Sequence, residues 1–67
     1  MGTWVLELQR ANVKIEYDED LKVCFILENG VLSENGKINI LLNAEEISKL
    51  EEFKKVCNLK VDLIKSN

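Results

Sequence analysis

The fold of this chain is decided by the stretch GKINILLNAEEISKL, residues 36–50. In its first half, Ile38, Ile40 and Leu42 alternate with Asn39 and Leu41. A period of two places every second side chain on the same face, so residues 37–42 are predicted to form a strand with one face on the core. The second half changes to a helical period. One residue, Asn43, separates the two patterns.

Asn43 predicts where the helix begins. Its side-chain oxygen can accept hydrogen bonds from the first helical turn, and Glu46, three residues later, can reach back to its amide, as in a capping box. Apolar residues then recur at spacings of three and four, which predicts a helix over residues 44–57 with one apolar stripe (Ile47, Leu50, Phe53, and Val56 or Cys57). Asn58 is a suitable left-handed residue to end it.

The residues before this stretch predict three strands in an antiparallel meander. The first covers residues 3–9 and the second residues 13–17, and their apolar phase slips by one residue, which favours a hairpin turn around Ala11 and Asn12. The third covers residues 21–28 and is apolar on both faces, with Val23, Phe25 and Leu27 on one and Cys24 and Ile26 on the other. Such a strand is central in its sheet or has its second face covered.

Two Asn-Gly pairs follow the third strand, Asn29-Gly30 and Asn35-Gly36, and either can form the apex of a hairpin. Val31 and Leu32 lie between the pairs, either in a short strand extension or in a projecting loop over residues 29–36. They are unusually apolar for an exposed tip, so they are candidate contact residues. After the helix, residues 59–64 predict a last strand with Leu59, Val61 and Leu63 inward.

Together these patterns predict one α+β domain over residues 1–67. Its four- to five-stranded, mainly antiparallel sheet packs on one helix, in the order four strands, helix, strand. The strands over residues 37–42 and 59–64 would run parallel, joined by a right-handed crossover.

Composition limits the partners. The chain has 67 residues, of which 46% are apolar, and a domain of this size gains from extra burial in a dimer. The net charge is −3, and one of the nine basic residues is Arg, so attraction to nucleic acid or anionic lipid is not expected. Cys24 and Cys57 lack metal-ligand or disulfide-scaffold spacing, and the chain shows no signal peptide or membrane-spanning run. A reduced, cytoplasmic setting follows, with Cys24 as a small core residue.

The sequence offers little for catalysis. There is no His, the three glycines lie at the terminus and in turns, and no Ser has a base partner in the pattern. We therefore expect no catalytic residue, cofactor or metal site. The acidic run Asp18-Glu19-Asp20 has two interpretations, a solvated turn or a site for a hard cation or for a mimic of nucleic-acid phosphates. It lacks the spacing of a calcium loop.

The function class predicted is a non-catalytic protein-interaction module, a small regulator or inhibitor of a larger enzyme. The Lys-, Asn- and Ile-rich composition, typical of AT-rich coding, favours a low-GC bacterium, an archaeon or one of their viruses. The alternative is a dimeric nucleic-acid-binding regulator that uses its Lys residues.

Partner-binding candidates fall into three groups, an outward apolar set, the apolar tip and the acidic turn: Val5, Ile26, Leu41 and Ile64; Val31 and Leu32; Asp18, Glu19 and Asp20. The outward set is predicted to form one patch that a homodimer buries. Trp4 and Tyr17 are either core residues or interface anchors.

Overall fold

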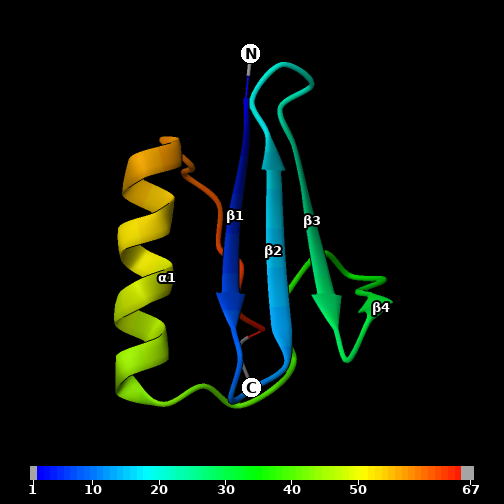
Figure 1. The fold of residues 1–67 in the computed structure, drawn as a ribbon, viewed down its shortest axis with the longest axis vertical. Coiled ribbons are helices and arrows are strands. Elements are labelled where there is room, and N and C mark those ends of the chain that lie inside the picture. Colours follow the sequence, from blue (N-terminus) through cyan, green and yellow to red (C-terminus); the bar gives the residue numbers. More distant parts are fainter. Residues whose placement is uncertain (1, 66–67) are drawn as a thin grey trace.

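The computed structural model describes residues 2–65 and is an α+β fold (Figure 1). A four-stranded antiparallel sheet has the order β1-β2-β3-β4, and the helix follows it in the chain. The strands are β1 (Thr3–Leu8), β2 (Val13–Asp18), β3 (Val23–Glu28) and β4 (Val31–Leu32), and the helix is α1 (Ala44–Cys57). This confirms the predicted fold class.

Three turns connect the strands, and a residue with positive φ stands in each of them. Asn12 (φ 53°) and Lys22 (φ 56°) each come last in a turn, over residues 9–12 and 19–22. The third turn is Asn29-Gly30, with φ values of 53° and 78°, as a two-residue hairpin with both central residues left-handed requires. The hairpin apex is therefore Asn29-Gly30 and not Asn35-Gly36, and the turn predicted at Ala11-Asn12 is confirmed.

The predicted fourth strand over residues 37–42 is wrong, because side chains occupy backbone groups that a sheet would need. The backbone N–H of Asn39 donates to the Glu28 carboxylate, and that of Lys37 donates to Asn35 Oδ1 at 3.0 Å. Ser33 Oγ donates to the carbonyl of Lys37 at 2.7 Å. The segment is thereby held as a loop, and the fourth strand is Val31–Leu32 instead.

The predicted fifth strand is reduced to a single parallel bridge. Ile38 pairs with Ile64, and the N–H of Ile38 donates to the Leu63 carbonyl at 2.6 Å. The parallel relation expected between the two segments is thus present at one point. Leu63 is buried and Val61 is exposed, so the inward position expected for Val61 is wrong.

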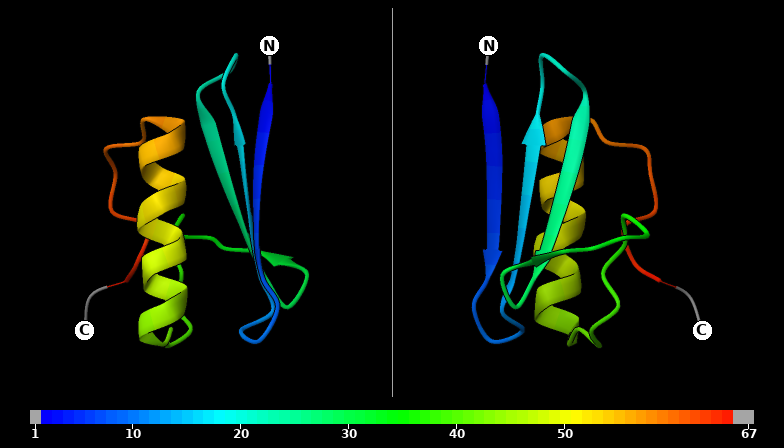
Figure 2. Two further views of the ribbon diagram at one scale, coloured as in Figure 1. Left: turned by 60° about the vertical axis from the view of Figure 1, so that its left-hand side comes forward. Right: turned by 90° about the vertical axis from the view of Figure 1, so that its right-hand side faces the viewer.

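One face of the sheet carries the core. Figure 2 shows α1 and the C-terminal segment as a second layer on the same side of the sheet. Ile15 lies directly opposite Ile26 across β2 and β3, and both are almost fully buried there against the second layer. The buried apolar residues are Leu8, Ala11, Val13, Ile15, Tyr17, Ile26, Ile38, Leu42, Leu50, Phe53, Cys57 and Leu63.

This register corrects the orientation of β3. Ile26 and Cys24 face the core, and Val23 and Phe25 face away from it. The turn over residues 19–22 places Val23 opposite Asp18, so Ile26 falls opposite Ile15 and shares its buried face. Phe25, the largest residue of β3, is left on the uncovered face.

The helix ends match their predicted caps. The N–H of Glu46 donates to Asn43 Oδ1 at 2.8 Å, and the Glu46 carboxylate accepts from the N–H of Asn43 at 2.9 Å. Asn58 is left-handed at φ 58°. Of the predicted stripe, Leu50, Phe53 and Cys57 are buried, while Ile47 and Val56 are exposed.

The single Arg of the chain joins the two layers. Arg10, in the first turn, donates through Nε to Glu46 Oε2 at 3.1 Å and through Nη2 to Oε1. Its Nη2 also donates to the Leu41 carbonyl at 3.4 Å. Glu46 is only 6% exposed. Its carboxylate thus accepts hydrogen bonds from Arg10 in the turn after β1 and from the N–H of Asn43 at the helix cap. The Arg10 guanidinium, and next the Asn43 amide, hold the pKa of Glu46 below its usual range.

We predict that Asn43→Ala lowers the free energy of unfolding by about 1 kcal/mol, because the N–H of Glu46 loses its acceptor, Asn43 Oδ1. In a domain of this size that is a fall of about 4–8 °C in melting temperature, measured by circular dichroism. Ser48→Ala, on the exposed side of the same helix, is the control and should not lower it. A melting temperature that Asn43→Ala leaves unchanged would contradict the role of this cap.

We also predict that Glu46 contributes to acid sensitivity. A carboxyl whose pKa is lowered in the folded state stabilises the protein above its unfolded pKa, and that contribution is lost as the pH falls through the folded pKa. From about pH 4.5 downward, the free energy of unfolding should therefore fall less in Glu46→Gln than in the wild type. Glu45→Gln, at an exposed neighbouring position, is the control. Its free energy of unfolding, measured by denaturant titration at each pH, should change with pH as that of the wild type does. If the free energy of unfolding falls equally with pH in all three proteins, the ion pair with Arg10 does not depress the pKa of Glu46.

Candidate functional site

The sheet face opposite α1, which we call the outer face, is the most unusual surface of the molecule. Its middle row runs across three strands from Val5 through Glu16 to Phe25. Val5 is 48% exposed and Phe25 is 44% exposed. Val23 and Leu32 are exposed beside them on β3 and β4. The outer face therefore carries an aromatic side chain in the middle of the sheet with no covering layer among the described residues.

The outer face is divided by the alternation within β2. Val13, Ile15 and Tyr17 of this strand are buried, so its other three residues, Lys14, Glu16 and Asp18, point outward. This polar column separates Val5 on β1 from the apolar column on β3 and β4, which contains Val23, Phe25, Leu27 and Leu32. The outer face thus carries an apolar column beside a polar column.

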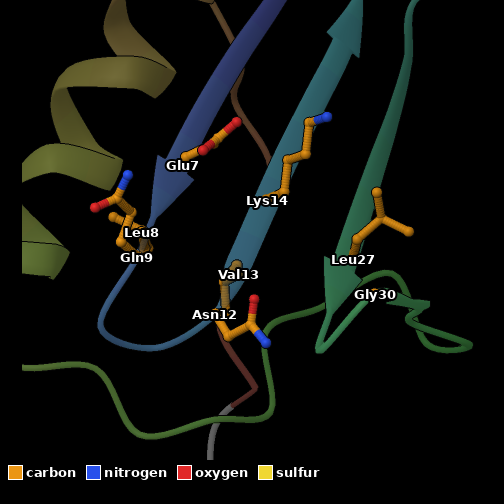
Figure 3. Close-up of a pocket in the computed structure, with 8 residues that line it drawn as sticks. All are labelled: Glu7, Leu8, Gln9, Asn12, Val13, Lys14, Leu27 and Gly30. Carbon is orange, nitrogen blue, oxygen red and sulfur yellow. The ribbon is translucent and has the colours of Figure 1, made fainter.

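A shallow groove of about 300 Å³ lies at one end of the outer face (Figure 3). The side chains of Glu7, Lys14 and Leu27 lie side by side on three neighbouring strands, and Asn12 and Gly30 close the end. The groove thus offers one carboxylate, one ammonium group and one apolar side chain. This mixture suits contact with a protein surface better than enclosure of a small molecule, for which pockets are mostly apolar and bury most of the ligand.

The acidic turn has a structural role. Asp18 Oδ1 accepts from the N–H of Asp20 at 2.9 Å and from that of Leu21 at 3.1 Å, which orders the turn between β2 and β3. Glu19 and Asp20 are exposed beside it. Within residues 2–65, no group of three or more Cys, Asp or Glu side chains is arranged to hold a metal ion. The interpretation as an ordered turn accounts for the position of Asp18.

The outward apolar set predicted from the sequence does not form one patch. Ile26 is 1% exposed and belongs to the core, because the turn before β3 sets its register opposite Ile15. Leu41 is 90% exposed, but it lies with the half-buried Ile64 beside a small groove next to α1, away from Val5. Val31 and Leu32 are exposed at β4.

Sequence reasoning missed Val23 and Phe25 as surface residues, and it also missed the contact of Arg10 with Glu46. The signal for the two surface residues was present in β2, whose strict alternation identifies its buried face. Counting across the turn over residues 19–22 then places Phe25 opposite the outward Glu16. No sequence signal distinguishes Arg10 from an ordinary exposed turn residue.

A second apolar feature lies along β1. A shallow groove of about 200 Å³ between this strand and the helix is lined by Leu6, Lys49, Glu52, Phe53 and Val56. Trp4 is on the same face as Leu6, opposite Tyr17, and is 40% exposed while Tyr17 is buried. Of the two aromatic residues left open by the sequence, Tyr17 is a core residue and Trp4 is half exposed at the sheet margin.

Both cysteines are free thiols, with Cys57 buried and Cys24 partly buried. Burial raises the pKa of each thiol, and the neighbouring Cys57 adds to the rise at Cys24. The Glu19 carboxylate adds to the rise at Cys57. In the part of the chain that the structure describes, the helix is too short and too polar to cross a bilayer.

The comparisons with known proteins found no family model, no curated protein and no solved structure that matches this chain. The case for a function therefore depends on the surfaces described above.

We predict that both thiols react slowly in the native protein. A raised pKa lowers the thiolate fraction at neutral pH, and burial limits access, so labelling by an aqueous thiol reagent at pH 7.5 should be at least about tenfold slower than in denaturant. Cys57 should react more slowly than Cys24 because it is more deeply buried. Mass spectrometry of quenched samples measures both rates. Native labelling of either Cys at the unfolded rate would make it a surface thiol.

Proposed function

We propose that this chain is a non-catalytic protein-interaction module that binds a larger protein through the outer face of its sheet. The observation that carries the proposal is Phe25, which is 44% exposed in the middle of a sheet face, in one apolar column with exposed Val23 and Leu32. Contiguous exposed apolar surface on a small protein commonly marks an interaction site. Regulation or inhibition of a larger enzyme is the role that such a small module best fits.

The chemistry of the outer face indicates the kind of partner. Phe25 and its apolar neighbours form the centre that loses water on binding, as aromatic anchors do in protein interfaces. Glu7, Glu16 and Asp18 outnumber Lys14 on the same face, so its charge is negative. A complementary partner presents an apolar patch beside Lys or Arg side chains.

The non-catalytic part of the proposal is supported by what the polar side chains already do. Asp18 orders a turn, Glu46 binds Arg10 and the helix cap, and Ser33 Oγ is bonded to the Lys37 carbonyl. The sequence contains no His to serve as a general base near pH 7. The free thiols support a reducing, cytoplasmic setting.

The test uses Phe25→Glu, with Leu41→Glu as its matched control. Both changes place a carboxylate on an exposed apolar residue, but Leu41 lies away from the outer face. We expect the wild type and Leu41→Glu to retain the same partner from native lysate, and Phe25→Glu to bind that purified partner at least about tenfold more weakly in a titration. Melting curves establish that both variants fold.

Two outcomes would contradict the proposal. One is equal affinity of Phe25→Glu and the wild type for the partner. The other is a steep, linear loss of log affinity with log salt concentration on a nucleic-acid probe, which would identify a phosphate binder instead.

A further inference from the structure

The free edge of β1 carries an inference that does not depend on the outer face. In the sheet of residues 2–65, β1 is paired with β2 alone, so its other edge has no strand beside it. Figure 2 shows α1 as a layer on one face of the sheet and not in line with its strands. Thr3, Trp4, Val5 and Glu7 are all exposed along this edge.

The register identifies which backbone groups point outward. Extended by one pair, it places Gly2 directly opposite Glu19, and the Glu19 N–H donates to the Gly2 carbonyl at 3.1 Å. In an antiparallel ladder a bond between directly opposite residues marks a hydrogen-bonded pair, and such pairs alternate along the strand. The backbone N–H and C=O groups of Trp4, Leu6 and Leu8 therefore point to β2. Those of Thr3, Val5 and Glu7 point to the free edge.

This edge lacks the features by which proteins prevent strand pairing. Natural edges are shortened, bulged, or given Pro or Lys residues. β1 runs for six residues, TWVLEL, paired in continuous register with β2, with one charged residue and no Pro or Lys. The opposite edge, β4, is only two residues long and is blunted in that way. The difference indicates that the β1 edge is used for pairing.

We propose that β1 pairs antiparallel with β1 of a second copy, about a two-fold axis through Val5, to give one continuous eight-stranded sheet. The outward backbone groups of Val5 then bond to those of the second Val5, and those of Thr3 to those of Glu7. Because the axis is perpendicular to the sheet, each pair of opposed residues must lie on one face. The register centred on Val5 satisfies this condition.

The side chains of this register are complementary. On the outer face, Val5 meets Val5 and Glu7 meets Thr3, so the two carboxylates of Glu7 are not opposed. On the other face, Trp4 of each copy lies opposite Leu6 of the other, beside the apolar groove that Leu6 forms with Phe53 and Val56. An aromatic residue paired with an aliphatic one across strands stabilises a sheet. This pairing places the half-exposed indole of Trp4 from each copy beside the groove of the other.

The experiment measures the mass of the full chain by light scattering between about 1 and 200 µM, with two variants. Wild type should rise from the 7.7 kDa chain mass to about twice that value. Val5→Pro removes an outward N–H that β2 does not use, and edge strands tolerate Pro at such positions. It should remain monomeric at all concentrations. The matched control Val5→Ala keeps the N–H and should dimerise within about tenfold of the wild type.

Two readouts on the wild type keep the test decisive even if Val5→Pro fails to fold. The amides of Val5 and Glu7 should exchange at least about tenfold more slowly at high than at low concentration, because pairing protects them. The emission of Trp4, the single Trp of the chain, should shift to shorter wavelength over the same range. A monomer mass at 200 µM would overturn the proposal, as would a dimer in which the Val5 amide exchanges freely. Phe25→Glu should dimerise normally, so failure here is distinguishable from failure of the proposed function.

Discussion

The carboxylate of Glu46 connects the two layers of this small fold. It receives the Arg10 guanidinium from the first turn of the sheet and the Asn43 amide from the start of the helix. Because the carboxylate is nearly buried, losing either donor would leave a charge in a poorly solvated position, which costs more than the bond itself contributes. The position of α1 against β1 follows from this contact together with the burial of Leu50 and Phe53.

One helix and two irregular segments cover one face of the sheet and no more. The buried apolar side chains lie between the inner face of the sheet and the second layer. Ile15, Ile26, Ile38 and Leu50 are at the centre of this core. A third layer would need more chain than the described residues supply. The outer face and the β1 edge are left open for that reason, and β3 is nevertheless apolar on both faces. An apolar outer face next to an unprotected edge is costly for a monomer in water, which is why both surfaces are interpreted as interfaces.

The two surfaces are compatible with each other. Pairing through the β1 edge extends the sheet in its own plane and leaves Phe25, Val23 and Leu32 exposed on the same side of both copies. A dimer of this kind presents two outer faces to a partner, and a bivalent partner would bind it more tightly than a single module. The polar column of β2 lies between the β1 edge and the apolar column. It would therefore contribute to the choice of partner in both the monomer and the dimer.

Local residue preferences are enough to predict the helix, its caps and the first turn. The caps at Asn43 and Asn58, the helix between them and the turn at Ala11-Asn12 follow from side-chain hydrogen bonds, left-handed preferences and apolar period, all of which act within a few residues. The first three antiparallel strands and the one helix could be expected on the same grounds. The choice between Asn29-Gly30 and Asn35-Gly36 could not, because both pairs have the same intrinsic preference.

The remaining features depend on how the elements pack and pair. A strand that is apolar on both faces carries no internal signal for its buried side, and the register opposite Ile15 is what put Ile26 inside and Phe25 outside. Residues 37–42 have the period of a strand, yet side chains from Glu28 and Asn35 occupy their amides and leave one bridge at Ile38. Arg10 donates a hydrogen bond to Glu46, which lies 36 residues later in the chain. The bridge between Ile38 and Ile64 and the pair of Arg10 with Glu46 join residues distant in sequence, and local pattern does not encode such contacts.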